Sequence, residues 1–285
     1  MPVNAHAKPI VVATVPALGQ IAQAIGGPNI KVHVLTRAGQ DAHVFYPKPG
    51  QADVLSRADL LISAGFGLEG QWLPSLLKLV KNPKIRLGSK GFFTGEDAIE
   101  AVGVLRGMSS KSLKKWSPEE NPFWWMDPEN GIKVATMLAL RLGEVDPVHE
   151  GDYLARAEDF SWLITRAIPR WKQKAAALKG PVITYHNSYN YFIKAMDIEL
   201  AGFIEPMPGI EPSTRHLDTL IRQVKEKRIA MIWVEPYHLG PVARRLAKES
   251  GVRLLVLPVA TDGRGVDGYM GMFDKIVLKI ERWSQ

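Results

Sequence analysis

The sequence predicts an α/β fold of two doubly wound lobes with parallel sheets, joined by one long backbone helix. Short apolar, β-branched runs alternate with helical stretches in each half of the chain, which is the pattern of parallel βαβ units. Between the halves, the residues from 147 to 178 form one long helical pattern. We therefore expect an N-terminal lobe at residues 1–145, a linking helix at 146–179 and a C-terminal lobe at 180–285.

The two halves contain the same order of elements. In the first half we expect strands at 8–15, 30–35, 59–64 and 84–88 and helices at 18–25, 51–58 and 68–80. In the second half we expect strands at 180–185, 199–204, 229–234 and 252–258 and helices at 188–196, 213–226 and 240–250. Ser213 suits the N-cap of one of these helices, because its hydroxyl can accept from a backbone N–H in the first turn.

The linking helix carries suitable residues at both ends. Asp146 and Pro147 suit its start, and Gly180 followed by Pro181 suits its end. Pro169 falls inside the run, where its missing N–H should kink or locally unravel the helix. A single helix of this length would hold the two lobes as a rigid pair.

The composition excludes several classes of protein. With 285 residues, 46% hydrophobic and 23% charged, the chain has the profile of an ordinary soluble globule, and no apolar run is long enough to span a membrane. Cysteine is absent, which excludes disulfides, Cys-ligated metals and thiol catalysis. The net charge of +7 is spread along the chain, so we expect no nucleic-acid partner. The small-x-small pattern at residues 5–7 suits a signal cleavage site, which favours an extracytoplasmic protein whose signal peptide has been removed.

Three possible metal ligands follow predicted strands, where doubly wound sheets bind their ligands. His43 follows the second strand of the first half, His186 directly follows the first strand of the second half, and Asp262 follows the last strand. Asp41 is close enough in sequence to orient the second ring nitrogen of His43. Imidazole and carboxylate donors on facing lobes would suit zinc or manganese. Each residue also has a structural interpretation, because a lone His is usually structural and Asp before Gly is common in turns.

Other polar residues offer further candidates. Glu211 could ligate a metal, support a ligand or place a charge at a helix N-terminus, and we expect it to support a ligand. His238, near Glu235, is the remaining histidine candidate.

A glycine pattern raises a different possibility. Gly65, Gly67 and Gly70 fit G-x-G-x-x-G after a predicted strand, the context of a dinucleotide site. However, this strand is the third of its half rather than the first. The region some 20 residues further on offers Arg86 and Lys90 in place of the acid that grips a ribose. Nicotinamide-cofactor binding therefore stays an alternative.

Five motifs resemble the periplasmic metal-binding receptors of ABC importers, the zinc- and manganese-specific group of solute-binding proteins. The resemblance covers nearly the whole chain. Residues 41–49 (DAHVFYPKP) look like the family's D-P-H-x-Y-x-P-x-P. The segments at 56–69, 185–192, 211–213 and 234–236 also match, and the first of them explains the glycine pattern. The resemblance implies two α/β lobes on a rigid backbone helix, with a metal held between them.

The resemblance implies His43 as first ligand, His186 as third and Asp262 as fourth. Residues 121–130 (NPFWWMDPEN) are similar to the family's N/D-P-H-x-W-x-D-P-E-N, but Phe123 stands at the position of the second metal-binding His. Because Phe cannot ligate a metal, the site reduces to two His and one Asp, with one position left for water or a cargo atom. The His-rich loop common in zinc members is also replaced, by a Ser- and Lys-rich stretch at 107–120.

The expected function is that of an extracytoplasmic receptor, not an enzyme, that carries zinc or manganese as cargo to a membrane ABC permease. We expect it to be a monomer. Two alternatives stay open. The same cleft could bind a metal complex or a small organic ligand, with Phe123 and either Trp124 or Trp125 as an aromatic wall. The chain could also be a metal- or nicotinamide-dependent enzyme, because catalytic zinc sites keep an open coordination position.

Overall fold

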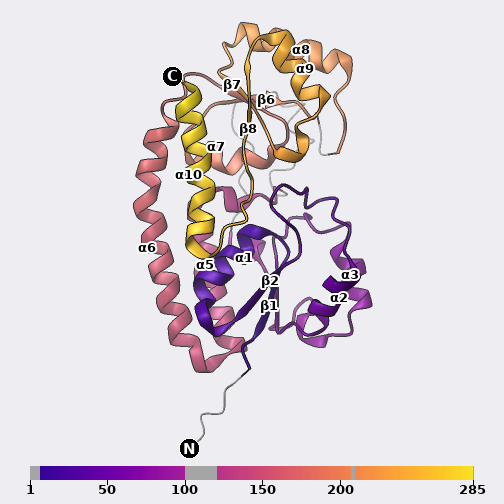
Figure 1. The fold of residues 1–285 in the computed structure, drawn as a ribbon, viewed down its shortest axis with the longest axis vertical. Helices are drawn as coiled ribbons and strands as arrows, with labels where there is room; N and C mark the ends of the chain where they lie inside the picture. Colours follow the sequence, from indigo (N-terminus) through magenta and orange to yellow (C-terminus); the bar gives the residue numbers. More distant parts are fainter. Residues whose placement is uncertain (1–6, 100–120, 207–208, 285) are drawn as a thin grey trace, which may run out of the picture.

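The computed structural model describes residues 7–99, 121–206 and 209–284. It contains two lobes, each built on a four-stranded parallel sheet (Figure 1). The predicted α/β fold class is therefore confirmed. Most of the expected cleavage segment at 5–7 and the Ser- and Lys-rich stretch at 107–120 lie outside the described residues. No helix in the described part of the chain has the length and apolar character needed to cross a membrane.

The N-terminal lobe has its first strand near the centre of the sheet. Its strands are β1 (Ile10–Ala13), β2 (Lys31–Val34), β3 (Leu60–Ser63) and β4 (Phe92–Thr94), in the order β2-β1-β3-β4. Its helices are α1 (Pro16–Gly26), α2 (Pro49–Ser56) and α3 (Leu73–Leu79). All neighbouring strands are parallel, so their carboxyl ends meet at one edge of the sheet.

The C-terminal lobe repeats the same strand order. Its strands are β5 (Val182–Thr184), β6 (Leu200–Phe203), β7 (Met231–Val234) and β8 (Arg253–Val256), in the order β6-β5-β7-β8. Its helices are α7 (Asn190–Ala195), α8 (Thr214–Glu226) and α9 (Pro241–Ser250). The strands are again all parallel. The repetition predicted from the order of elements is thus present in the sheets.

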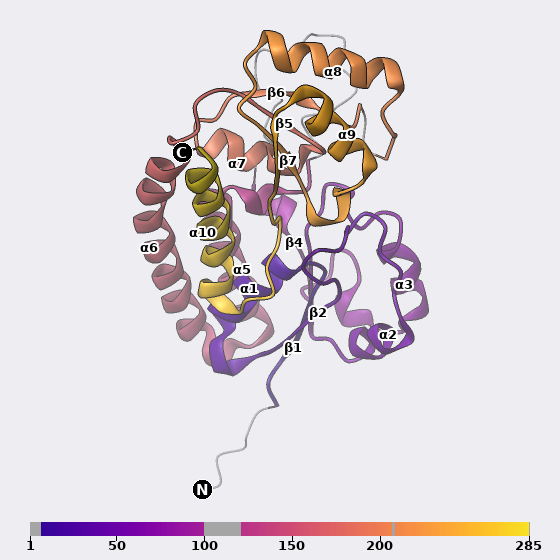
Figure 2. The same ribbon diagram turned by 45° about the horizontal axis from the view of Figure 1, so that its top comes forward.

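Three long helices form a spine beside both lobes. They are α5 (Pro128–Val145), α6 (Glu150–Ala175) and α10 (Gly265–Ser284). Figures 1 and 2 show α6 and α10 side by side along one flank of the molecule. The predicted linking helix is confirmed as α6, which begins after a 3-10 turn at Pro147–His149. Pro169 lies inside α6 and does not end it.

Other expectations for the N-terminal lobe and the spine were wrong or incomplete. The strand expected at 84–88 is absent, because Pro83–Ile85 form a 3-10 turn and Gly88 adopts a φ of 82°. The fourth strand is β4, further along the chain. Helices α5 and α10 were not predicted. Although α10 belongs to the expected C-terminal lobe, it packs on α1 and α6, so the proposed lobe boundaries stay a prediction.

The strands alternate between a shared central core and separate outer cores. In β1, Val11 and Ala13 enter the central core, whereas Val12 enters an outer cluster beneath α2 and α3. In the other lobe, Met231 and Trp233 enter the same central core, whereas Ile232 packs beneath α8 and α9. One continuous apolar core therefore joins the inner faces of both sheets to the spine.

Aromatic stacking fastens the spine to the C-terminal lobe. Phe273 of α10 stacks on Trp171 of α6 with ring centroids 4.7 Å apart, and it also stacks on Phe192 of α7 at 6.3 Å. The indole Nε1 of Trp171 donates to Oδ1 of Asp274 at 2.8 Å. All three aromatic rings are fully buried.

Replacing Phe273 by Ala should lower the free energy of unfolding by about 3–5 kcal/mol, because a buried aromatic ring is lost and leaves a cavity. Denaturant titration followed by circular dichroism measures this change. Leu278→Ala on the same helix, where the side chain is 50% exposed, should stay within about 0.5 kcal/mol of the parent protein. Similar losses in both variants would contradict the fastening role of this ring.

Candidate metal centre

His43 lies on the loop between β2 and α2, and two contacts fix it. Oδ1 of Asp41 lies 2.9 Å from the backbone N of His43 and 3.0 Å from its ring Nδ1. The indole of Trp72 donates to the carbonyl of Ala42 at 2.8 Å, which ties the loop to the lobe.

The charge state of Asp41 decides which nitrogen of His43 can bind a metal. Burial alone would raise the pKa of Asp41, but hydrogen bonds from His43 and the nearby charges of His43 and His238 lower it below its usual range. A carboxylate only accepts hydrogen bonds, so Nδ1 of His43 must be the donor. This leaves Nε2 as the nitrogen available to a metal.

His186 follows β5 directly and is almost completely buried. Its Nδ1 lies 2.5 Å from Oε2 of Glu205, which follows β6 and is also buried. Its carbonyl accepts from the hydroxyl of Thr184 at 2.7 Å. The imidazole–carboxylate pairing of His43 with Asp41 thus recurs at His186. Sequence reasoning missed Glu205, although its place at a strand end was a signal that could have found it.

Phe123 completes a triangle with the two histidines. The ring centroids of His43 and His186 lie 5.4 Å apart, and that of Phe123 lies 5.7 Å and 5.8 Å from them. In a tetrahedral zinc site with Zn–N bonds of about 2.1 Å, two ligating imidazole rings have centroids about 5 Å apart. The three rings therefore have close to the spacing of a three-histidine site, with an aromatic hydrocarbon at one corner.

The segment around Phe123 is pinned in the core. Oδ1 of Asn121 accepts from the backbone N of Phe123 at 3.0 Å, and its Nδ2 donates to the carbonyl of Asn187 at 3.0 Å. Trp124 donates through Nε1 to the carbonyl of Ala64 at 2.9 Å, and Trp125 donates to that of Val259 at 2.8 Å. Both indoles are buried, so Phe123 is the ring of this segment that meets the histidines.

Asp262 and Glu211 lie outside this triangle of rings. The side chain of Asp262 is exposed and accepts from the backbone N of Ala38 at 3.3 Å. It lines a small pocket with Arg37 and Thr261. Glu211 is also exposed, and its charge acts on Tyr185. In the described part of the chain, no three His, Asp or Glu side chains are grouped closely enough to hold a metal ion.

His238 is a further ring neighbour of His186. It ends the 3-10 turn Pro236–His238 after β7, and its ring centroid is 6.0 Å from that of His186. Its Nδ1 lies 3.0 Å from Oε2 of Glu235. Burial alone would lower the pKa of His238, but the hydrogen bond to Glu235 and the charges of Glu235, Asp41 and Glu205 raise it above its usual value.

The glycine-rich loop after β3 is occupied by carboxylates. Buried Glu69 accepts from the backbone N of Ala64 at 2.7 Å and of Gly65 at 3.3 Å, and Glu96 accepts from the backbone N of Phe66. The N–H groups that would cradle a phosphate in a dinucleotide site are therefore already bonded. This geometry does not favour a nicotinamide cofactor here.

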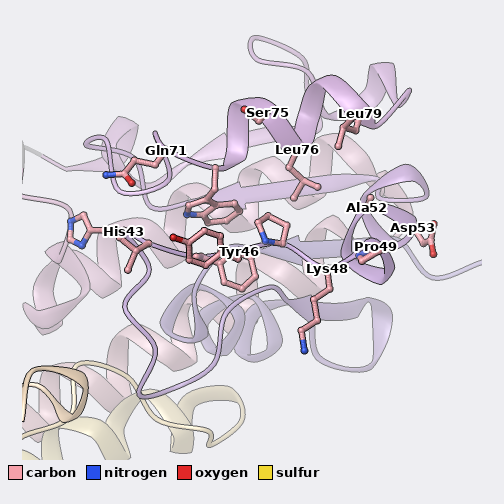
Figure 3. A pocket seen from close by; sticks show the side chains of 14 residues that line it. His43, Tyr46, Lys48, Pro49, Ala52, Asp53, Gln71, Ser75, Leu76 and Leu79 are labelled. Atoms are coloured by element: carbon pink, nitrogen blue, oxygen red, sulfur yellow. The ribbon is translucent and has the colours of Figure 1, made fainter. Parts of the chain in front are cut away.

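An apolar groove of about 620 Å³ lies beside His43 on the N-terminal lobe. Figure 3 shows His43 at one end of this groove and Asp53 at the other, with Tyr46 between them. Trp72, Leu76 and Leu79 also line it, as do two prolines of the 41–49 segment. His43 thus belongs to both the groove and the triangle of rings.

Known proteins resemble this chain over nearly its whole length. The substrate-binding lipoprotein SloC of a metal ABC transporter in Streptococcus mutans is 26% identical over 284 residues, covering 97% of this chain and 90% of that protein. The manganese ABC transporter lipoprotein PsaA of Streptococcus pneumoniae is 26% identical over 277 residues, covering 95% and 87%.

Solved structures share the fold. A crystal structure of ZnuA superposes with a TM-score of 0.80 at 23% identity, covering 98% of this chain and all of that one. FpvC of Pseudomonas aeruginosa, in complex with Mn²⁺, superposes with a TM-score of 0.74 at 21% identity, covering 97% and 98%. Residues 11–282 match the family described as the periplasmic component A of the zinc-uptake complex, ZnuA. The chain therefore belongs to the ZnuA family.

Proposed function

We propose that this protein captures a divalent metal ion, zinc or manganese, between its two lobes and delivers it to a membrane ABC permease outside the cytoplasm. The observation that carries the proposal is the triangle of His43, Phe123 and His186, whose ring spacings suit metal coordination. Relatives named as metal and manganese ABC transporter lipoproteins support it.

The proposed ligands are His43 and His186 through Nε2 and Asp262 through a carboxylate oxygen, with water completing the shell. Asp41 and Glu205 would hold the two imidazoles in the orientation that presents Nε2. Asp262 would have to leave the backbone of Ala38 to reach the ion. The metal is cargo, so binding and release are the whole activity and no catalytic step is proposed. The receptor would act as a monomer.

The charges of the cleft favour cation capture in spite of the positive chain. The net charge is +7, yet Asp41, Glu205 and Glu235 each lie against a histidine of the cleft. Carboxylates gathered in a partly buried cleft raise the local concentration of cations. The proposed entry point for metal is therefore locally acidic.

A second candidate is a metal complex or small organic ligand as cargo. The groove beside His43 favours it, because about 620 Å³ lies in the range of roughly 300–1,000 Å³ that is usual for small-molecule sites. The donor missing at Phe123 could then be supplied by the cargo itself.

Removal of His186 tests the proposal directly. The metal-free protein should take up one equivalent of zinc or manganese by elemental analysis and calorimetry, and His186→Ala should lose most of that affinity, because a nitrogen ligand is removed. His216→Ala, at a histidine of α8 whose Nε2 faces the carbonyl of Phe203, serves as the control and should bind as the parent does. An absence of stoichiometric metal in the parent protein would sink the proposal.

A histidine at position 123 distinguishes the two candidate cargoes. Phe123→His should raise zinc affinity at least about 10-fold, because an additional imidazole enters at ligand spacing. Calorimetry with a competing chelator measures the change, and Phe123→Leu is the matched control without a donor. Strong zinc binding that arises only in Phe123→His would favour the second candidate, because the native cleft would then be specialised away from the free ion.

Asp41 should contribute to metal affinity, because it orients the imidazole of His43. Asp41→Asn should weaken metal affinity by roughly 10–100-fold, since a neutral amide replaces the carboxylate charge that holds the ring and increases the basicity of Nε2. Asp53→Asn, at the far end of the groove, should leave the affinity unchanged. Equal affinities in the parent protein and in Asp41→Asn would exclude the orienting role.

A further inference from the structure

A fourth ring, that of His238, lies beside His186. His238 stands 6.0 Å from His186, centroid to centroid, and its side chain is 22% exposed. Its ring stacks on Tyr185 at 4.4 Å with an interplanar angle of 17°, which fixes the plane of the imidazole. Because it sits on a short 3-10 turn at the end of β7, it occupies the same sheet edge as His186.

The chemistry of His238 repeats that of the other two cleft histidines. Each has Nδ1 against a carboxylate oxygen, at 3.0 Å for His43, 2.5 Å for His186 and 3.0 Å for His238. In metal sites this pairing fixes the ring and increases the basicity of the ligating nitrogen. At His238 it leaves Nε2 as the nitrogen that a metal could take.

The pairing alone does not make a site, as a fourth example demonstrates. At the start of α6, Nδ1 of His149 lies 2.7 Å from Oδ2 of Asp146, and the hydroxyl of Tyr153 donates to the same oxygen at 2.5 Å. Both of these contacts serve local structure at the start of α6. What distinguishes His238 is its position beside His186.

The carboxylate behind His238 is also incompletely bonded. Glu235 is fully buried, and among the described residues its Oε1 has no hydrogen-bond partner. A buried carboxylate is unfavourable unless a positive group compensates it. An imidazole that binds a cation through Nε2 acquires positive character, so metal at His238 would supply that compensation.

The N-terminal lobe contributes to the surroundings of His238. Asp41, which holds the ring of His43, lies near enough for its charge to act on His238, and the charge of His238 acts in turn on Asp41. His238 therefore faces the loop that carries the first proposed ligand.

We propose that Nε2 of His238 is a third imidazole ligand of the metal and replaces the nitrogen that the family motif loses at Phe123. The inference rests on the proposed function of the cleft. The described side chains do not form a three-donor group as they stand, so the turn with His238 must approach His43 when the ion binds. The spacing of 6.0 Å from His186 is within about 1 Å of ligand spacing. With Asp262, the site would contain three imidazole nitrogens and one carboxylate oxygen, a set that suits zinc better than manganese.

The test uses the metal-free full chain of the parent protein, His238→Gln and the matched control His149→Gln. Calorimetry with a competing chelator should show zinc affinity reduced at least about 100-fold in His238→Gln. This reduction exceeds the one expected when a residue that only hydrogen-bonds to a ligand is lost. Manganese affinity should fall less, so the preference for zinc should narrow. His149→Gln should bind zinc as the parent does, and circular dichroism checks the fold of each variant.

X-ray absorption of the zinc-loaded parent protein counts the imidazoles without any substitution. Three are expected in the parent protein and two in His238→Gln. The assignment of His238 would be overturned by a count of two imidazoles in the parent protein. It would also be overturned if a folded His238→Gln bound zinc within about twofold of the parent. In both cases the metal-receptor function would stand. Failure of the parent protein to bind metal would instead overturn the function, and the assignment with it.

Discussion

The single apolar core shared by both sheets and the spine is the constraint on which the site depends. Because the inner faces of both sheets and the rings on α6 and α10 pack into one cluster, separation of the lobes would expose that cluster to water. The cost of such exposure, about 25 cal/mol per Å² of apolar surface, grows with every buried ring. In the proposed site, any approach of the ligands to the ion would therefore come from the loops that carry His43 and His238, both partly exposed.

The three rings differ in burial: Phe123 lies in the core, whereas the side chains of His43 and His238 are partly exposed. Phe123 belongs to a segment tied at both ends, by the amide of Asn121 and by the indoles that follow. In the proposed site, a cation would draw the turns of His43 and His238 together beside the buried ring of Phe123.

Much of the fold could be predicted because parallel βαβ units have a strong sequence pattern. The order of strands and helices, the linking helix and the placement of His43 and His186 at strand ends all follow from it. The strand expected at 84–88 failed because Ile85 packs into the core from a 3-10 turn while Leu87 is exposed, and no local pattern distinguishes such a turn from a strand. The nearness of His238 to His186 could not be read from the chain, since it depends on the pairing of β5 with β7. The motif identified Phe123 as a replaced ligand, but only the structure places its ring at ligand spacing.

The burial of Phe123 has a consequence for the rate of exchange as well as for affinity. Its side chain is 3% exposed, so an ion at the centre of the triangle would be shielded from solvent on that side. Among the described residues of the site, the partly exposed side chains of His43 and His238 would then offer water and incoming donors a way to the ion. Loading and release would be paced by the opening of those two turns, whereas the number of nitrogens would set how tightly the ion is held. In such a receptor, substitutions in the two turns would change the residence time of the ion, whereas substitutions of the ligands would change its affinity.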